Sequence, residues 1–261
     1  MDAKKLTQQR FGKYAEGYVT SPSHAGGSDL ERLVELVGGA SSCEVLDVAT
    51  GAGHTARAVA PHVRHVVATD LTPAMLSTAR DFLTRHEVPN VSFALADAED
   101  LPFADGRFDL VTCRIAAHHF PHPERFLSEA ARVLRPGGLL LLQDQVGPPD
   151  SATALYVNAF ERRRDPSHVR ALSEAEWVEA LMTAGLELET IDRFEKQMAL
   201  DQWAGRQGGT SKDLSDLQAL LTQAPKLARE WMRPGDLENS EAEFVIHHCL
   251  FSARRPTAGR P

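Results

Sequence analysis

The sequence has few of the features that mark membrane, secreted and metal-binding proteins. Its 261 residues include only three cysteines (Cys43, Cys113 and Cys249), which are widely spaced and form no Cys-x-x-Cys pair. Buried thiols in a reducing compartment therefore fit better than a disulfide or a zinc site. The longest apolar run, Leu139 to Leu142, is far shorter than the ~20 residues of a membrane span. The amino-terminal stretch has no apolar core and no small-residue cleavage site, which predicts a cytoplasmic protein.

An excess of positive charge is also missing. Lys and Arg together number 28 against 36 Asp and Glu, so the formal net charge is -8. This balance disfavours a nucleic-acid backbone as the main partner. A hydrophobic fraction of 43% with 25% charged residues is typical of a globular protein. The length fits one enlarged domain, or one domain with a lid.

Short strand-like runs alternate with helical stretches between Cys43 and about Asp144. The runs are EVLDV, HVVAT, VSFAL, FDLVTC and LLLLQD. Helical stretches with apolar residues at spacings of three and four lie between them. One begins at Thr72, expected as the helix cap, and another follows Pro123 and ends at Pro136-Gly137. The alternation predicts right-handed crossovers and a doubly wound α/β core, a mostly parallel sheet with helices on both faces.

The flanking segments follow a different pattern. Residues 1–40 predict a helical cover with a loop near residues 21–28, and residues 256–261 a flexible tail. We expect a helix over 150–164, a second helix that starts with a Ser173-to-Glu176 capping box, and a strand over 186–191. The polar segment of about 197–240 reads as a helical insertion, and residues 241–254 as a long final strand. The main domain is therefore placed at 41–255, with a cofactor-binding core at 43–145.

The strongest signal for function is the glycine-rich turn in VLDVATGAGHTA. An apolar strand ends at Asp47, and the turn that follows leads into a helix. Gly51 and Gly53 allow the backbone to approach a ligand, and the helix amino terminus attracts a negatively charged group. Asp70 ends the next strand, beside this turn, where a carboxylate accepts hydrogen bonds from ribose hydroxyls. Together these features predict a cofactor that contains adenosine.

Two classes of cofactor fit this turn. GAGHTA matches the dinucleotide fingerprint G-x-G-x-x-A, which would mean NAD(P) and hydride transfer, although the sequence has no Tyr-x-x-x-Lys pattern. Asp47 would repel a pyrophosphate, but it can hold the amino group of a methionine moiety, directly or through water. The pattern D-x-A-x-G-x-G, from Asp47 to Gly53, resembles motif I of the class I S-adenosylmethionine (SAM)-dependent methyltransferases. Ala49 replaces the first glycine of that motif.

The resemblance extends from about residue 43 to residue 144. ATDLTPAMLSTAR is similar to the second strand of the family, FALADAEDLPFADGRFDLVTCR to its adenine-binding turn and fourth strand, and LSEAARVLRPGGLLLLQD to its fifth strand. The leading RFGKYAEGYVTS is similar to the ubiquinone and menaquinone C-methyltransferase-like branch. The resemblance implies a Rossmann-like, seven-stranded sheet with an antiparallel last strand. It also implies SAM as cofactor, S-adenosylhomocysteine (SAH) as product, and cofactor contacts from Tyr18, Asp47, Ala49, Gly51, Gly53, Asp70, Leu71, Met75, Asp97, Ala98 and Arg114.

A histidine-rich segment, RIAAHHFPHP, follows the fourth strand at the edge where open α/β sheets bind ligands. His118 and His119 are candidate general bases because the pKa of imidazole lies near neutrality. They fit equally well as polar packing in a rim loop. His119, Tyr156 and His168 are candidate substrate contacts. A metal site is disfavoured because prolines interrupt the segment.

The acceptor leaves a weaker trace in the sequence. No [DNS]-P-P-[YFW] motif follows the fourth strand and no Pro-Cys nucleophile occurs, which disfavours methylation of nucleic acid. The basic cluster of residues 162–170 is explained by a solvated helix end as well as by an anionic substrate. We therefore predict C- or O-methylation of a small molecule, such as a quinone-like or other aromatic compound. A non-catalytic cofactor-binding protein and an NAD(P)-dependent oxidoreductase are the alternatives. The acceptor, the methylated atom and a homodimeric state stay open.

Overall fold

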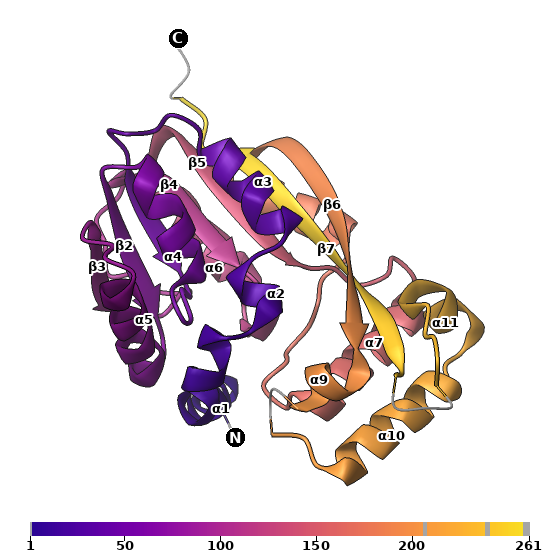
Figure 1. The fold of residues 1–261 in the computed structure, drawn as a ribbon. Coiled ribbons are helices and arrows are strands. Elements are labelled where there is room, and N and C mark those ends of the chain that lie inside the picture. Colours follow the sequence, from indigo (N-terminus) through magenta and orange to yellow (C-terminus); the bar gives the residue numbers. More distant parts are fainter. Residues whose placement is uncertain (1, 206–207, 238–240, 258–261) are drawn as a thin grey trace.

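A twisted seven-stranded sheet forms the centre of the computed structural model, which describes residues 2–205, 208–237 and 241–257 (Figure 1). The strand order is β3-β2-β1-β4-β5-β7-β6, and only β7 runs antiparallel to its neighbours among the described strands. This arrangement confirms the predicted Rossmann-like fold. The strands are Glu44–Val48 (β1), His65–Asp70 (β2), Val91–Leu95 (β3), Phe108–Arg114 (β4), Leu134–Gln145 (β5), Glu187–Ala199 (β6) and Glu243–Arg254 (β7).

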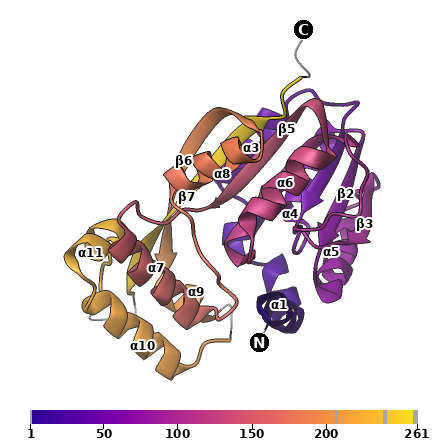
Figure 2. The same cartoon turned by 180° about the vertical axis from the view of Figure 1, so that it is seen from behind.

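Helices cover both faces of the sheet, and the helices of the carboxyl-terminal part of the chain gather beside β6 and β7 (Figures 1 and 2). None of the described helices is long and apolar enough to cross a membrane. The helices are Ala3–Val19 (α1), Pro22–Ala25 (α2), Ser28–Val37 (α3), His54–Val59 (α4), Pro73–Arg85 (α5), Pro123–Val133 (α6), Ser151–Arg164 (α7), Glu174–Thr183 (α8), Leu200–Gly205 (α9), Ser211–Thr222 (α10) and Lys226–Met232 (α11), with 3-10 helices at Ala60–His62 (η1) and Ala117–His119 (η2).

The alternation of side chains along the strands produces two cores. On one face, Leu33 of α3 and Phe82 of α5 pack with Val45 of β1. On the other face, Phe126 of α6 and Trp177 of α8 are buried with the neighbouring strand residues. Successive strand residues point to opposite faces, so a parallel strand covered on both sides is apolar throughout. The helix that follows Pro123 ends at Val133, three residues before the predicted stop, because β5 already begins at Leu134.

The carboxyl-terminal half extends the sheet and adds a third apolar cluster. The strand predicted at 186–191 continues to Ala199, so that β6 and β7 form a long antiparallel ribbon. Phe160 of α7 stacks on Trp203 of α9, with ring centroids 5.2 Å apart, and Phe244 of β7 packs against both rings. The predicted helical insertion therefore begins at residue 200. Parts of it, 206–207 and 238–240, lie outside the described residues, as do residues 258–261 of the predicted tail.

The first two helices, α1 and α2, lie at the carboxyl edge of the parallel strands, whereas α3 covers one face of the sheet (Figure 1). α1 packs against α5, and the segment predicted as a loop at 21–28 contains the short helix α2. The predicted capping box at the start of α8 is present, with Ser173 and Glu176 bonded to each other's backbone N–H. The predicted side-chain cap of α5 is absent, because the hydroxyl of Thr72 makes no hydrogen bond to the first turn of the helix. The backbone N–H of Thr72 instead donates to the carboxylate of Asp70 at 2.8 Å.

Candidate functional site

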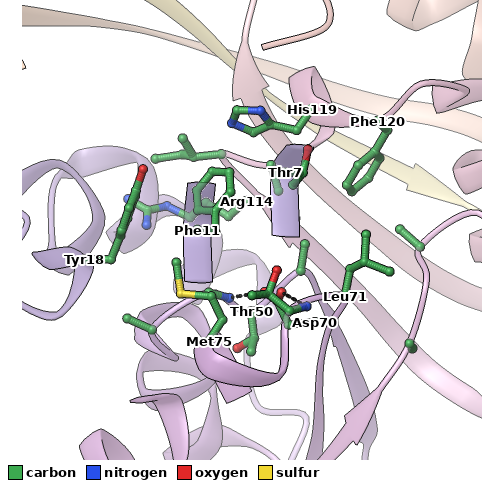
Figure 3. A pocket seen from close by; sticks show the side chains of 18 of the residues that line it. Thr7, Phe11, Tyr18, Thr50, Asp70, Leu71, Met75, Arg114, His119 and Phe120 are labelled. Atoms are coloured by element: carbon green, nitrogen blue, oxygen red, sulfur yellow. Dashed lines mark hydrogen bonds between the residues drawn. The ribbon is translucent and has the colours of Figure 1, made fainter. Parts of the chain in front are cut away.

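A pocket opens at the carboxyl ends of β1, β2, β3 and β4 (Figure 3). Open α/β sheets bind ligands at this edge. The loops that follow the four strands line the pocket together with residues of α1. The pocket brings together most of the predicted cofactor contacts, namely Tyr18, Ala49, Gly51, Asp70, Leu71, Met75, Asp97, Ala98 and Arg114, and also His119.

Three residues of the glycine-rich turn have positive φ angles, but for different reasons. Gly51, at φ +56°, has no atom within 4 Å of the position that a Cβ would take, so this face of the turn is open. Gly53, at φ +91°, would place a Cβ 3.3 Å from the side chains of Ala79 and Leu83 in α5. Gly53 therefore permits close helix packing and, contrary to the sequence prediction, does not line the pocket. Ala49 adopts φ +53°, a conformation that disfavours residues with a Cβ.

Asp70 is held at the pocket wall by two backbone donors. Its Oδ2 accepts from the N–H of Gly51 at 3.0 Å, and its Oδ1 accepts from the N–H of Thr72. Burial raises the pKa of Asp70, and the backbone hydrogen bonds oppose that shift. A carboxylate has about four acceptor positions, so these two bonds leave capacity for hydroxyl groups of a ligand.

The turn after β3 carries an ion pair that sequence analysis did not identify. Nζ of Lys4, from α1, lies 2.6 Å from a carboxylate oxygen of Asp97 and 2.6 Å from one of Glu99. Although burial lowers the pKa of Lys4, the bonds to both carboxylates raise it on balance. All three residues line the pocket, so these ion pairs connect α1 to the turn after β3 on the pocket wall.

Asp47, predicted to hold a methionine amino group directly or through water, does not line the pocket itself. Its side chain is buried away from the pocket and accepts hydrogen bonds from the hydroxyls of Thr50 (2.6 Å) and Thr112 (2.7 Å). Burial raises its pKa to about 6, and the two hydroxyls oppose this shift. Asp47 therefore ties the turn to β4 and makes no direct contact with the pocket space.

Arg114 lines the pocket, but its guanidinium is engaged with the amino-terminal cover. Nε and Nη2 donate to Oδ2 of Asp29, and Nη1 donates to the carbonyl of His24. Lys196 of β6 also binds Oδ2 of Asp29, at 2.9 Å. The guanidinium of Arg114, a predicted cofactor contact, is therefore part of a buried ionic cluster that joins β4, α3 and β6.

A second pocket adjoins the first. Five residues line both pockets: Phe11, Tyr18, His24, Ile115 and His119. The lining of the second pocket includes the apolar side chains of Met198 and Trp203 and polar side chains from β5, β6 and the end of α7. Two adjoining pockets with a shared wall suit a reaction between two bound molecules.

The predicted histidines are distributed unequally around the second pocket. His118 and His119 line it, and their ring centroids are 4.2 Å apart. His168 is buried beside them, but it does not line either pocket, and its Nε2 donates to Oδ1 of Asn158 at 2.7 Å. Tyr156 also lies outside both pockets and donates its hydroxyl to the carbonyl of Leu220. Two of the four predicted acceptor-site side chains, those of Tyr156 and His168, therefore lie outside both pockets.

The basic cluster of residues 162–170 forms ion pairs within the protein. Arg163 binds two aspartates of α10, and Arg170 binds Glu176. Within the described ranges, no group of three or more His, Cys, Asp or Glu side chains is arranged to hold a metal ion. Cys113 and Cys249 are buried free thiols and Cys43 is partly buried, which agrees with the sequence analysis.

Comparisons with known proteins agree with this geometry. Residues 46–142 match the family model described as a methyltransferase domain. The methyltransferase YcgJ of Bacillus subtilis is 39% identical over 203 residues, which cover 78% of this chain and 80% of YcgJ. The crystal structure of a methyltransferase from Bacillus halodurans superposes with a TM-score of 0.84 at 41% identity, over 88% of this chain and all of that one. The C-methyltransferase UbiE of Pseudomonas paraeruginosa is 37% identical over 131 residues, 49% of this chain and 51% of UbiE. The chain therefore belongs to the methyltransferase family of this model, and YcgJ, which is similar to it in sequence, is likewise named a methyltransferase.

Proposed function

We propose that this protein binds SAM in the first pocket and transfers its methyl group to a small molecule bound in the second. The observation that carries the proposal is the pair of adjoining pockets, which share the wall around Tyr18 and His119. A direct methyl transfer needs the nucleophile and the methyl carbon in line, with water excluded. Family membership alone supports the reaction class, and the adjoining second pocket supports an acceptor of small size.

The residues of the first pocket fit an adenosine-containing sulfonium. Asp70 retains acceptor positions for ribose hydroxyls, and the open face of Gly51 allows a ligand to approach the backbone. In this proposal Asp97 and Ala98 contact the adenine, and Leu71 and Met75, which also line the pocket, are its apolar neighbours. SAM supplies an activated methyl group on a positively charged sulfur, so the protein itself contributes mainly binding, alignment and exclusion of water.

The second pocket supports an acceptor that is partly aromatic and partly polar. The lining of this pocket combines aromatic and aliphatic side chains with imidazole, carboxylate and guanidinium groups, and the Arg164 guanidinium lies over the Trp203 ring. The similarity to UbiE proteins, named for ubiquinone and menaquinone biosynthesis, favours a quinone-like ring among aromatic acceptors. We leave C- and O-methylation as equal parts of the proposal.

Calorimetric titration of the full chain with SAM, SAH and NADH tests the cofactor. We expect micromolar dissociation constants for the two sulfur ligands, which correspond to about −8 kcal/mol. Binding of NADH alone would support the oxidoreductase alternative and refute the proposal. Binding of SAM without release of SAH in the presence of any small-molecule acceptor would support a non-catalytic cofactor-binding protein instead.

A further inference from the structure

Resting on the proposed function, we propose that Nε2 of His118 accepts the acceptor's proton, that Asp144 is its positioning residue, and that the acceptor is a phenol or an enol. Sequence analysis left His118 and His119 as equal candidates and did not single out Asp144. The hydrogen bonds around the three residues separate their roles.

The side chain of Asp144 fixes both the position and the tautomer of His118. Asp144 is fully buried in β5. Its Oδ1 lies 2.6 Å from Nδ1 of His118, and its Oδ2 accepts from the backbone N–H of the same residue at 2.8 Å. Because a carboxylate only accepts hydrogen bonds, Nδ1 must carry the proton. Nε2 is then the atom that can take up another proton, and no described residue bonds to it.

His119 lacks the corresponding partner. Its Nδ1 donates to the carbonyl of Ser167 at 3.0 Å, and its Nε2 is 4.0 Å from the nearest oxygen of Asp165, beyond hydrogen-bond distance. Burial and the charge of His118 lower the pKa of His119. His119 therefore stays neutral and forms part of the wall between the two pockets.

The surroundings of His118 support a proton acceptor that works near neutral pH. Burial alone lowers its pKa, but the charge of Asp144 and the hydrogen bond to it raise the pKa above its usual value. An oriented carboxylate–imidazole pair is a common form of general base. The other titratable or charged groups around this ring are His119, Glu161, Arg164, Asp165, His168 and His248.

The polar residues that line the second pocket favour an acceptor with an acidic hydroxyl group. Arg164 lines this pocket, and its Nε is buried without a hydrogen-bond partner among the described residues. An unpaired buried donor is costly, and an oxygen atom of a ligand would satisfy it. Lys196, which is paired with Asp29, is a second cationic side chain in the lining of this pocket. Met198 and Trp203, whose ring carries the Arg164 guanidinium at 4.4 Å, add apolar surface for the body of a phenol or a cyclic enol.

The step balances with the two substrates and the protein alone. The acceptor hydroxyl gives its proton to Nε2 of His118, and an electron pair of the resulting oxyanion, or of its conjugated carbon, forms a bond to the methyl carbon. The bond from that carbon to sulfur breaks, and its electron pair stays on sulfur in SAH. C-methylation of the ring also releases the proton of the attacked carbon to solvent. His118 then loses its proton to solvent.

Nitrogen-15 NMR of the imidazole side chains, in the full chain with SAH, tests the assignment without an acceptor. We expect one histidine with a protonated Nδ1 in its neutral form and a raised pKa, and this signal should vanish in His118→Gln. Asp144→Asn should lower that pKa by about 1–3 units, because it removes the opposing charge. His65→Gln, at the opposite end of β2, is the matched control and should leave the signal unchanged. Absence of a raised pKa at His118, or no effect of Asp144→Asn, would overturn the assignment.

Rates of SAH release with a panel of phenols and 1,3-dicarbonyl compounds test the substrate class, with amines, thiols and carboxylates as the contrast. With a phenol or an enol, kcat should rise with pH through the pKa of His118 and then level. His118→Gln should lower kcat by about 10²- to 10⁴-fold with little change in KM and should remove the pH dependence. Turnover of only the contrast compounds, or of none of the panel, would overturn the substrate class. Calorimetry with SAH on the same samples separates the claims: a wild-type chain that binds no SAH refutes the proposed function itself.

Discussion

Replacing Asp47 by Asn should change stability in a pH-dependent manner. The Asp47 carboxyl is 1% exposed, and burial raises its pKa from 3.8 to about 6 in the folded protein. A group whose folded pKa is raised in this way binds a proton more tightly in the folded state than in the unfolded state. For a carboxyl group, the folded state therefore loses stability as the pH rises from about 4 to above 6.

The size of the effect follows from the two pKa values. A difference of one pKa unit corresponds to 1.36 kcal/mol, so the ionised Asp47 destabilises the fold by about 3 kcal/mol at pH 8 and by less than about 1 kcal/mol at pH 4. Asparagine has no charge to bury, and its amide can still bond to the hydroxyls of Thr50 and Thr112. Because the amide NH2 donates where a carboxyl oxygen accepted, one of the two hydrogen bonds must be rearranged, at a cost of about 1 kcal/mol at both pH values.

Urea denaturation of both proteins at pH 4 and pH 8 measures this difference. We subtract the free energy of unfolding of the wild type from that of Asp47→Asn. We expect this difference to be about 2 kcal/mol larger at pH 8 than at pH 4, so the variant gains stability relative to the wild type as the pH rises. Other titrating groups are shared by the two proteins and cancel. An equal difference at the two pH values would refute the reasoning. Because Asp47 does not line the pocket, the variant should also keep its affinity for SAH within about threefold, whereas a direct contact with the methionine amino group would cost about 1–3 kcal/mol.

Four further predictions concern the glycine-rich turn and the helix that closes the pocket. Gly53→Ala should lower the free energy of unfolding by about 1–3 kcal/mol, measured by urea denaturation, because its Cβ would meet α5 in a strained conformation. Gly51→Ala, where the Cβ would enter the open pocket, should instead weaken SAH binding about tenfold or more in calorimetry, and an equal affinity would contradict this. Ala49→Gly should stabilise the fold by about 0.5–1 kcal/mol, because it relieves a positive φ, and a lower melting temperature would argue against that strain. Lys4→Met should speed SAH release about two- to fivefold in stopped-flow measurements, since the partly exposed ion pair is worth about 1 kcal/mol or less, and high salt should have the same effect on the wild type.

The local features of the fold could be predicted from the sequence because they depend on neighbouring residues. The apolar runs that form β1 to β5 and the spacing of the buried face of α6 are visible over a few positions. The glycine-rich turn and Asp70 were predictable for the same reason, since strand, turn and helix follow one another directly. The capping box of α8 spans only four residues.

Side-chain partners far apart in the sequence could not be predicted. Arg114 was assigned to the cofactor, but its partner Asp29 lies 85 positions earlier and only the fold brings the two together. Asp144 was read as the end of a strand, although its carboxylate contacts a histidine 26 positions away. Tyr156 is a predicted substrate contact, but its hydroxyl bonds to the carbonyl of Leu220 in α10, 64 positions away.

A crystal structure of the full chain with SAH tests the central claim most directly. We expect the adenosine in the first pocket, with the ribose hydroxyls donating to the Asp70 carboxylate and the adenine beside Asp97 and Ala98. The sulfur should face the wall that contains Tyr18 and His119, where the second pocket begins. SAH bound elsewhere, or in this pocket with its sulfur directed away from the second pocket, would contradict the account.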